Sequence, residues 1–513
     1  ALARSIGKDI DVKKMNLRYV KVNDRQDTVR FQYGGKHFAW AVKKNSLKDE
    51  GAVQLPPARR QRHWMEVDDE KDGKPVPSPD GKYVAFIKND NVYVKDKASG
   101  RERALSIDGT LGNYYSSYIQ WSPDSRYVFS NRIRPVEKRY VYYVESSPKD
   151  QLQPKLHKQE YAKPGDELRT LLPCIYEVET GRAIIPSTEL FDKQYELSWF
   201  RWNEQGTGVT FEYNERGHQT YRLLELSAET GTVRTVVEEK SPTFVNYLRT
   251  FRHFLKGGNE LVWMSERDNW NHLYLYDYAT GKVKNQITKG QWYVREVLHV
   301  DEDARQVYFT ASGMEAGEDP YLVRYYRIGL DGTGLTCLTP DECHHKATFS
   351  SDRKYLVDVH SLVDRAPEAA LRRVSDGSMV MPLEKADISA LTEAGWRAPE
   401  VFVAKGRDGK TDMWGIIVRP TNFDPNKKYP VIEYIYAGPG SHYVPKSFSA
   451  YNYNMTSLAE LGFIVVQLDG MGTSFRSKEF EDVCYKNLKD AGFPDRKAWI
   501  RAAAEKYPYM DID

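Results

Sequence analysis

YPVIEYIYAGPG, residues 429–440, begins as an apolar segment and ends in a loop of glycine and proline. Residues 431–436 are rich in β-branched and aromatic side chains, which is typical of a strand buried in a parallel sheet. The Ala-Gly-Pro-Gly segment that follows ends the strand, because glycine and proline favour turns. The pattern therefore predicts a strand-to-loop junction at Tyr436.

Tyr436 is the candidate catalytic residue of the chain. A phenol at the end of a strand, beside a glycine loop, can donate a hydrogen bond to a negative charge that develops on a substrate oxygen. The alternative is a buried strand that ends in an ordinary turn and takes no part in chemistry. We hypothesise that Tyr436 is an oxyanion-hole donor.

Short segments of the chain resemble the dipeptidyl peptidase IV branch of the prolyl oligopeptidase family of serine peptidases. Tyr-Pro-Val at 429–431 and Tyr-Ala-Gly-Pro at 436–439 look like the motif whose tyrosine is the family's oxyanion donor. GFIVVQLDGMGTSF, residues 462–475, looks like the next hydrolase strand and its glycine turn. The resemblance extends through the whole chain. It implies an eight-bladed β-propeller followed by an α/β-hydrolase domain.

Internal repeats also predict a propeller. Turns of the Ser-Pro-Asp type begin at Ser78, Ser122 and, more loosely, Ser350, and each ends on a tyrosine. Tyr/Val/Ile-rich strands that close on glycine recur between them. Two alternating hairpins per period give a four-stranded antiparallel blade, and a β-sandwich would not repeat one turn at regular spacing. We count about seven blades and predict a propeller domain over residues 1–385.

The repeated turn makes a specific prediction about four aromatic residues. We expect Tyr83, Trp121, Tyr127 and Tyr355 to occupy equivalent positions in their blades. A proline- and charge-rich stretch at about 135–173 interrupts the repeats and is expected to be an insertion in one blade.

The inner face of the propeller departs from the family's pattern. In the family, a pair of glutamates there and on one inserted arm holds the free amino terminus of the substrate. The corresponding stretch here, 108–118, contains no Glu-Glu pair. This difference argues against cleavage dipeptide by dipeptide. We expect the substrate pocket between the propeller's inner face and the Tyr436 loop, with the insertion or Tyr114 and Tyr115 beside it.

Residues 386–513 are predicted to be the N-terminal part of the α/β-hydrolase domain. Two strands around the turn at 407–410 open it, and helices are expected at about 455–461 and 494–506. In the family, the final segment precedes the strand that carries Gly-x-Ser-x-Gly. We therefore expect the domain to be truncated before the nucleophile. The serine, aspartate and histidine of the triad are not in this chain, which is predicted to be inactive alone.

Composition excludes several classes of function. The 513 residues predict two unequal domains, and 74 basic against 72 acidic side chains, a formal charge of +2, do not favour binding to nucleic acid. Apolar runs stay below the ~18 residues of a membrane span, so no membrane span is expected. The first residue is Ala1 and no leader opens the chain, so an export signal was removed or not included. We expect a periplasmic or extracellular protein.

The four cysteines are too few for a disulfide scaffold. Cys337 and Cys343 are close in sequence and precede His344 and His345. Adjacent histidines on a strand point to opposite faces, so at most one could join two cysteines around zinc. A disulfide between Cys337 and Cys343, or two unpaired thiols, is favoured over a metal site. No cofactor is predicted.

The leading hypothesis is a serine exopeptidase of the dipeptidyl or tripeptidyl aminopeptidase type that cleaves short peptides through an acyl-enzyme. Family members often dimerise, so the resemblance also allows a homodimer. The alternative is a non-catalytic propeller that binds a partner and carries a relic hydrolase fold. Met471 favours this alternative slightly, because the family commonly has arginine there.

Overall fold

The computed structural model describes residues 2–6, 10, 15–23, 25–53 and 67–513. The chain forms two compact units. One unit comprises Ala1–Asp68 and Lys138–Gly165, and the other comprises Asp69–Glu137 and Asp166–Asp513.

The first unit contains a short helix, a four-stranded antiparallel sheet and a hairpin. The helix is α1 (Leu2–Ile6). The sheet has the order β1 (Arg18–Val22), β2 (Thr28–Tyr33), β3 (Lys36–Ala41) and β4 (Ser46–Ala52). The hairpin pairs β12 (Tyr140–Glu145) with β13 (Lys155–Glu160). It lies within the stretch predicted to be an insertion, and it separates two paired strands of the second unit.

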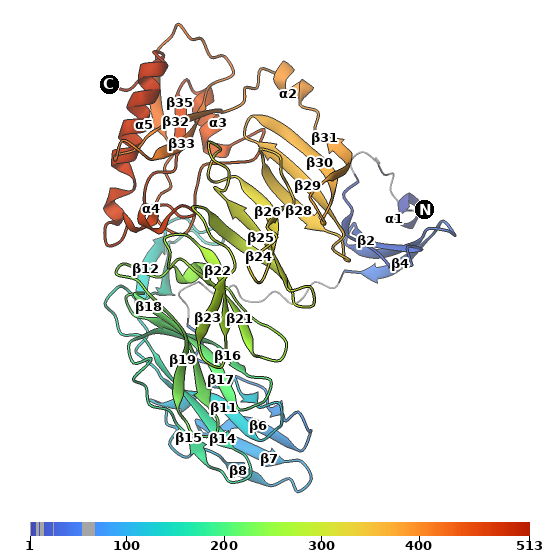
Figure 1. Ribbon diagram of the computed structural model, residues 1–513, viewed down its shortest axis with the longest axis vertical. Helices are drawn as coiled ribbons and strands as arrows, with labels where there is room; N and C mark the ends of the chain where they lie inside the picture. Colours follow the sequence, from blue (N-terminus) through green and yellow to red (C-terminus); the bar gives the residue numbers. More distant parts are fainter. Residues whose placement is uncertain (1, 7–9, 11–14, 24, 54–66) are drawn as a thin grey trace. The chain divides into compact units, whose positions relative to one another are not determined.

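Six antiparallel sheets follow one another in the second unit, coloured from blue to orange in Figure 1. The first two are β5 (Val76–Pro77), β6 (Tyr83–Lys88), β7 (Asn91–Asp96) and β8 (Glu102–Ala104), then β9 (Tyr114–Tyr115), β10 (Gln120–Trp121), β11 (Tyr127–Arg134), β14 (Thr170–Glu177) and β15 (Ala183–Ile184). The next two are β16 (Gln194–Trp202), β17 (Gly208–Glu215), β18 (Thr220–Ser227) and β19 (Val233–Lys240), then β20 (Arg252–Phe254), β21 (Glu260–Ser265), β22 (His272–Asp277) and β23 (Lys282–Gln286). The last two are β24 (Tyr293–Asp301), β25 (Gln306–Ser312), β26 (Val323–Gly329) and β27 (Thr336–Cys337), then β28 (His344–Phe349), β29 (Tyr355–Leu362), β30 (Arg365–Arg373) and β31 (Met379–Lys385). With the sheet of the first unit, seven propeller-type sheets lie within the described residues, as predicted.

One hydrogen-bond pattern explains why the Ser-Pro-Asp type of turn recurs. In its best-buried copy, Ser122 Oγ donates to Asp124 (2.6 Å) and accepts from the backbone N–H of Tyr127 (2.8 Å). The copies at Ser78 and Ser350 make the same two bonds. The side chain thus closes each hairpin locally, so the turn can be recognised in the sequence.

The four aromatic residues beside these turns are only partly equivalent. Tyr83, Tyr127 and Tyr355 each begin the second strand of their sheet, as predicted. Trp121 instead lies on a first strand, β10, where it stacks on Tyr83 of the preceding sheet at 6.4 Å between ring centroids. Tyr127 stacks in the same way on Trp202 of the following sheet, at 6.1 Å. The placement of Trp121 with the tyrosines was therefore wrong, because Trp121 precedes the turn and lies on the strand before it.

We expect Ser122→Ala to destabilise the propeller by about 1–3 kcal/mol, because the N–H of Tyr127 loses its acceptor in a site without water access. Ser122 is fully buried, whereas Ser350 is only half-buried. Ser350→Ala removes the same bonds where water can replace them, so it should cost less. Urea unfolding of both variants measures the difference. Equal losses would contradict the role given to burial.

The last part of the chain forms a mixed sheet with the order β32 (Glu400–Lys405), β33 (Asp412–Val418), β35 (Ile464–Leu468), β34 (Tyr429–Glu433) and β36 (Met510–Asp511). β34 is parallel to β35 and β36, as predicted for the start of a hydrolase domain. The helical segments are α2 (Ser389–Glu393), α3 (Tyr453–Glu460), α4 (Lys478–Asp482), η3 (Leu488–Asp490) and α5 (Phe493–Lys506). In the core, the ring of Trp499 of α5 packs against that of Phe402, with the ring centroids 5.0 Å apart.

The end of β34 differs from the predicted one. β34 ends at Glu433, so Tyr436 lies three residues beyond the strand and not at its last residue. The last hydrogen bond of the β34–β35 ladder runs from the N–H of Tyr434 to the carbonyl of Val466, at 2.9 Å.

The domain boundary at 385/386 stays a prediction: β31 ends at Lys385 and β32 begins at Glu400, but the compact units divide the chain elsewhere. Among the described helices, none has the length and apolarity needed to cross a bilayer.

Candidate active site and its cavity

Tyr436 lies in an exposed loop between β34 and α3. Its side chain is 63% exposed, and its ring packs on that of Tyr443 with centroids 4.4 Å apart. Its hydroxyl makes no hydrogen bond to any residue that the structure describes. The phenol is therefore available to a ligand, while the neighbouring ring restricts its orientation.

Two buried side chains hold the backbone of this loop. Asp469, which follows β35 and is fully buried, accepts hydrogen bonds from the N–H groups of Tyr443 (2.8 Å) and Val444 (3.0 Å). Burial raises the pKa of Asp469, and the two N–H donors oppose that rise. Ser474, also fully buried, accepts from the N–H of Gly440 at 2.7 Å. The loop is thus fixed at two points after Tyr436, at Gly440 and at Tyr443 with Val444.

Ser474 also connects the loop to the propeller through hydrogen bonds. Its Oγ donates to Glu481 of α4 at 2.7 Å, and Asn246 Nδ2, which follows β19, donates to the same carboxylate at 3.1 Å. Burial raises the pKa of Glu481. A chain of hydrogen bonds therefore runs from Gly440 of the loop to Asn246, in the propeller segment that follows β19.

Arg249 provides a second link between the propeller and the loop. It ends the short helix η2 (Tyr247–Arg249), and its guanidinium donates to the carbonyl of Gly440. The same guanidinium lies 4.3 Å from the ring centre of Phe475, and that of Arg295 lies 3.4 Å from it. Two cationic side chains therefore contact one ring beside the loop, an arrangement favoured by the negative face of the aromatic system.

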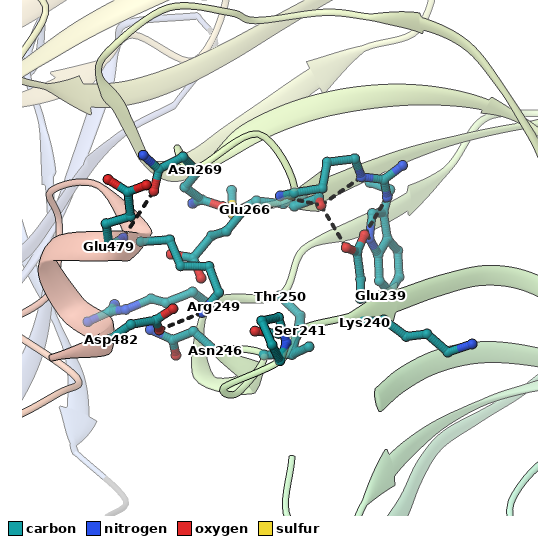
Figure 2. Close-up of a pocket in the computed structure, with 18 residues that line it drawn as sticks. Glu239, Lys240, Ser241, Asn246, Arg249, Thr250, Glu266, Asn269, Glu479 and Asp482 are labelled. Carbon is teal, nitrogen blue, oxygen red and sulfur yellow. Dashed lines mark hydrogen bonds and ion pairs between the residues drawn. The ribbon is translucent and has the colours of Figure 1, made fainter. Parts of the chain in front are cut away.

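A cavity of about 270 Å³ adjoins this network (Figure 2). One wall comes from β19, η2 and β21 with the residues that follow them, and the other from α4, where Glu479 and Asp482 lie. Its charged lining residues are Glu239, Lys240, Arg249, Glu266, Arg267, Lys478, Glu479 and Asp482. Arg249 belongs to this lining and also donates to the carbonyl of Gly440, so it connects the cavity to the backbone of the Tyr436 loop.

Glu266 is the most perturbed acid of the cavity. One of its oxygens accepts from the hydroxyl of Tyr293 at 2.9 Å. Burial raises the pKa of Glu266 to about 7, and the nearby carboxylate of Glu481 acts in the same direction. A carboxyl group that changes charge near neutral pH, in a cavity, is typical of a functional site.

Several sequence-based expectations about the site have a clear outcome. Tyr114 and Tyr115 are core residues of β9, 3% and 1% exposed, and they do not line the cavity. Cys337 and Cys343 are both free thiols, so the disulfide alternative was wrong. Met471 is partly buried and packs against the hydrophobic core of the mixed sheet, and its backbone N–H donates to Asp495 at 3.0 Å.

His345 takes part in a buried charge network. Together with Asp358 and His360 it places ligand-type atoms within 4.8 Å of one another. However, the ring nitrogens of His345 already contact Asp358 and the carbonyl of Asp341, each at 2.9 Å, and Arg372 Nε donates to Asp358 at 2.8 Å. The guanidinium of Arg372 already supplies the positive charge that a metal ion would bring to Asp358. This cluster therefore fits a salt-bridge network better than a metal centre.

Known proteins match the chain along most of its length. Residues 14–367 match the dipeptidyl peptidase IV (DPP IV) N-terminal region, and residues 448–513 match the prolyl oligopeptidase family. A dipeptidyl aminopeptidase of Schizosaccharomyces pombe is 26% identical over 79% of this chain and 54% of that protein. Prolyl endopeptidase FAP of Mus musculus is 23% identical over 83% of this chain and 60% of that protein. The chain spans about half the length of the curated relatives it matches.

A solved structure has the same fold. The crystal structure of Porphyromonas gingivalis dipeptidyl peptidase 4 superposes with a TM-score of 0.65. The match covers 98% of this chain and 73% of that one, at 21% sequence identity. At this identity the likeness supports the architecture, a propeller followed by the beginning of a hydrolase domain.

Proposed function

We propose that this chain, which belongs to the dipeptidyl peptidase IV branch of the prolyl oligopeptidase family, is part of a serine exopeptidase that removes short units from peptides. The observation that carries the proposal is the Tyr436 loop. Its phenol is exposed, while Asp469 and Ser474 fix the backbone beside it. A donor held in this way needs no reorganisation when a negative charge develops on a carbonyl oxygen.

The proposed reaction is acyl transfer through an acyl-enzyme. A serine attacks the scissile carbonyl, a histidine accepts its proton, and an aspartate orients the histidine. The hydroxyl of Tyr436 and one backbone N–H then donate to the oxyanion. The chain contains no Gly-x-Ser-x-Gly segment, so we assign the nucleophile to a part of the protein outside these 513 residues. Tyr436 is the only catalytic group assigned within them.

Three further parts of the proposal rest on resemblance. We propose short peptides as substrates, because the named relatives are peptidases. Location in the periplasm or outside the cell, and assembly as a homodimer, stay predictions.

The full-length protein should hydrolyse chromogenic dipeptide and tripeptide substrates that end in proline or alanine, and a fluorophosphonate should label it and stop the reaction. The rate of nitroaniline release with and without the inhibitor measures this. A protein that neither cleaves these substrates nor reacts with the fluorophosphonate would contradict the proposal. That result would favour the alternative, a propeller that binds a partner and carries a relic hydrolase fold.

A further inference from the structure

We propose that Asp319 of the propeller is a positioning residue for Tyr436, and that it acts through its ion pair with Lys446 of the Tyr436 loop. The catalytic part of this inference rests on the proposed function, because it needs Tyr436 as the oxyanion donor. The contact itself does not depend on that function. Lys446 Nζ lies 2.6 Å from Asp319 Oδ2, and the two residues are 127 positions apart in the chain.

The ion pair is buried on both sides. The side chains of Lys446 and Asp319 are 4% and 12% exposed. The Lys446 ammonium also lies 4.9 Å from the ring centroid of Tyr321, which is fully buried. Among the described residues, Asp319 is the only one that forms a hydrogen bond or ion pair with this ammonium group. Loss of the carboxylate would therefore leave a buried positive charge without a partner.

The propeller itself fixes the orientation of Asp319. This residue lies in the connection between β25 and β26, and its Oδ1 accepts from the N–H of Tyr321 at 3.0 Å. A carboxylate that bonds to the backbone two residues later is held by its own turn. The other oxygen, Oδ2, contacts Lys446. The position of the anionic partner is thus set by the propeller and not by the loop.

Lys446 is connected to Tyr436 through a short backbone segment and one ring contact. The N–H groups of Tyr443 and Val444, which precede Lys446 closely, donate to Asp469. The ring of Tyr443 packs on that of Tyr436, with centroids 4.4 Å apart. A shift of Lys446 would therefore move the ring against which the phenol of Tyr436 rests.

Two further propeller contacts restrain the same loop. Arg249 donates to the carbonyl of Gly440, before Lys446 in the chain. After it, the N–H of Phe448 donates to Oγ of Ser361, a buried residue of β29, at 3.1 Å. Three separate propeller segments therefore contact the loop. The contact at Lys446 is the one of the three in which opposite charges meet, so its removal should have the largest effect.

Hydrogen exchange of the 513-residue chain tests the contact without any assumption about activity. Asp319→Asn keeps the shape of the side chain and removes its charge. We expect the amides of residues 440–448 to exchange about tenfold or more faster than in the parent chain, while β25 and β26 keep their protection. Exchange in this loop that stays unchanged would overturn the proposal.

Two further variants separate positioning from general destabilisation. Glu318→Gln is the matched control, because Glu318 precedes Asp319 but pairs with Arg324 of β26 at 2.7 Å, within the propeller. It should leave the loop's exchange within about twofold of the parent rate. Adding Lys446→Met to Asp319→Asn removes the unpaired charge, so the melting temperature should recover while the loop still exchanges fast. Equal acceleration by Glu318→Gln, or slow exchange in the double variant, would contradict the role of the ion pair.

Kinetics of the full-length protein test whether the contact acts through Tyr436. Asp319→Asn should lower kcat by about 10–10²-fold with little change in KM, because a displacement of about 1 Å is enough for such a loss. In a Tyr436→Phe background the same substitution should cost less than about threefold, since the hydroxyl that it positions is already absent. Equal losses in both backgrounds would contradict the positioning role. A parent protein that hydrolyses no peptide would contradict the proposed function, and the exchange experiment would still decide whether the ion pair holds the loop.

Discussion

The 513-residue chain alone should show no peptidase activity above the uncatalysed background, whereas the full-length protein should turn over the same chromogenic substrates. Loss of a nucleophilic serine or its histidine costs on the order of 10⁶ in kcat for a serine peptidase, and here the whole triad is assigned outside the chain. Binding in the cavity and one oxyanion donor leave only a small residual acceleration. Nitroaniline release by both proteins at equal concentration measures the difference.

Neither Ser474 nor Ser441 is placed to act as a nucleophile. Ser474 is fully buried and bonded to Gly440 and Glu481, while Ser441 donates to the backbone carbonyl of His442 at 2.9 Å. His442 lies 4.0 Å from Asp469, but burial lowers its pKa to about 2, so it is a poor proton acceptor at neutral pH. Ser441→Ala should therefore not change the background rate. Fluorophosphonate-sensitive turnover by the chain alone would contradict this placement of the catalytic groups.

Local patterns made the propeller predictable. The hydroxyl of Ser122 or Ser350 bonds within its own turn, so six consecutive residues determine the hairpin. Trp121 was misplaced because its partner, Tyr83, belongs to another sheet and lies 38 positions earlier in the chain. The end of β34 was also misjudged. Residues 434–436 are as apolar as the strand, but the pairing of β34 with β35 ends at Val466, although β35 continues to Leu468.

The candidate site likewise contains residues that could be predicted from the sequence and residues that could not. Tyr436 could be found because it belongs to a short motif with a glycine loop. Arg249 and Asn246 could not, since their bonds to Gly440 and Glu481 connect residues 191 and 235 positions apart. Glu266 gave no sequence signal either. Its pKa is raised by burial and by the carboxylate of Glu481. Both effects arise because the propeller segment that follows β21 packs against α4.

Replacing Tyr436 by phenylalanine in the full-length protein should lower kcat by about 10²–10³, which is the usual cost of one oxyanion-hole donor. KM should change little, because the ring still packs on Tyr443 and only the hydroxyl is lost. Stability should also be nearly unchanged, since that hydroxyl is bonded to no described residue. Steady-state kinetics on a dipeptide nitroanilide, together with a thermal melt, separates a catalytic role from a structural one.

Tyr443→Phe is the matched control for this experiment. It removes a hydroxyl from the other ring of the stacked pair, while the backbone N–H of Tyr443 keeps its bond to Asp469. We therefore expect Tyr443→Phe to keep kcat within a few-fold of the parent value. If Tyr436→Phe retained full kcat, or if both variants lost activity equally, the oxyanion role would be wrong. The loop that Asp469 and Ser474 hold would then have to position substrate by its backbone alone.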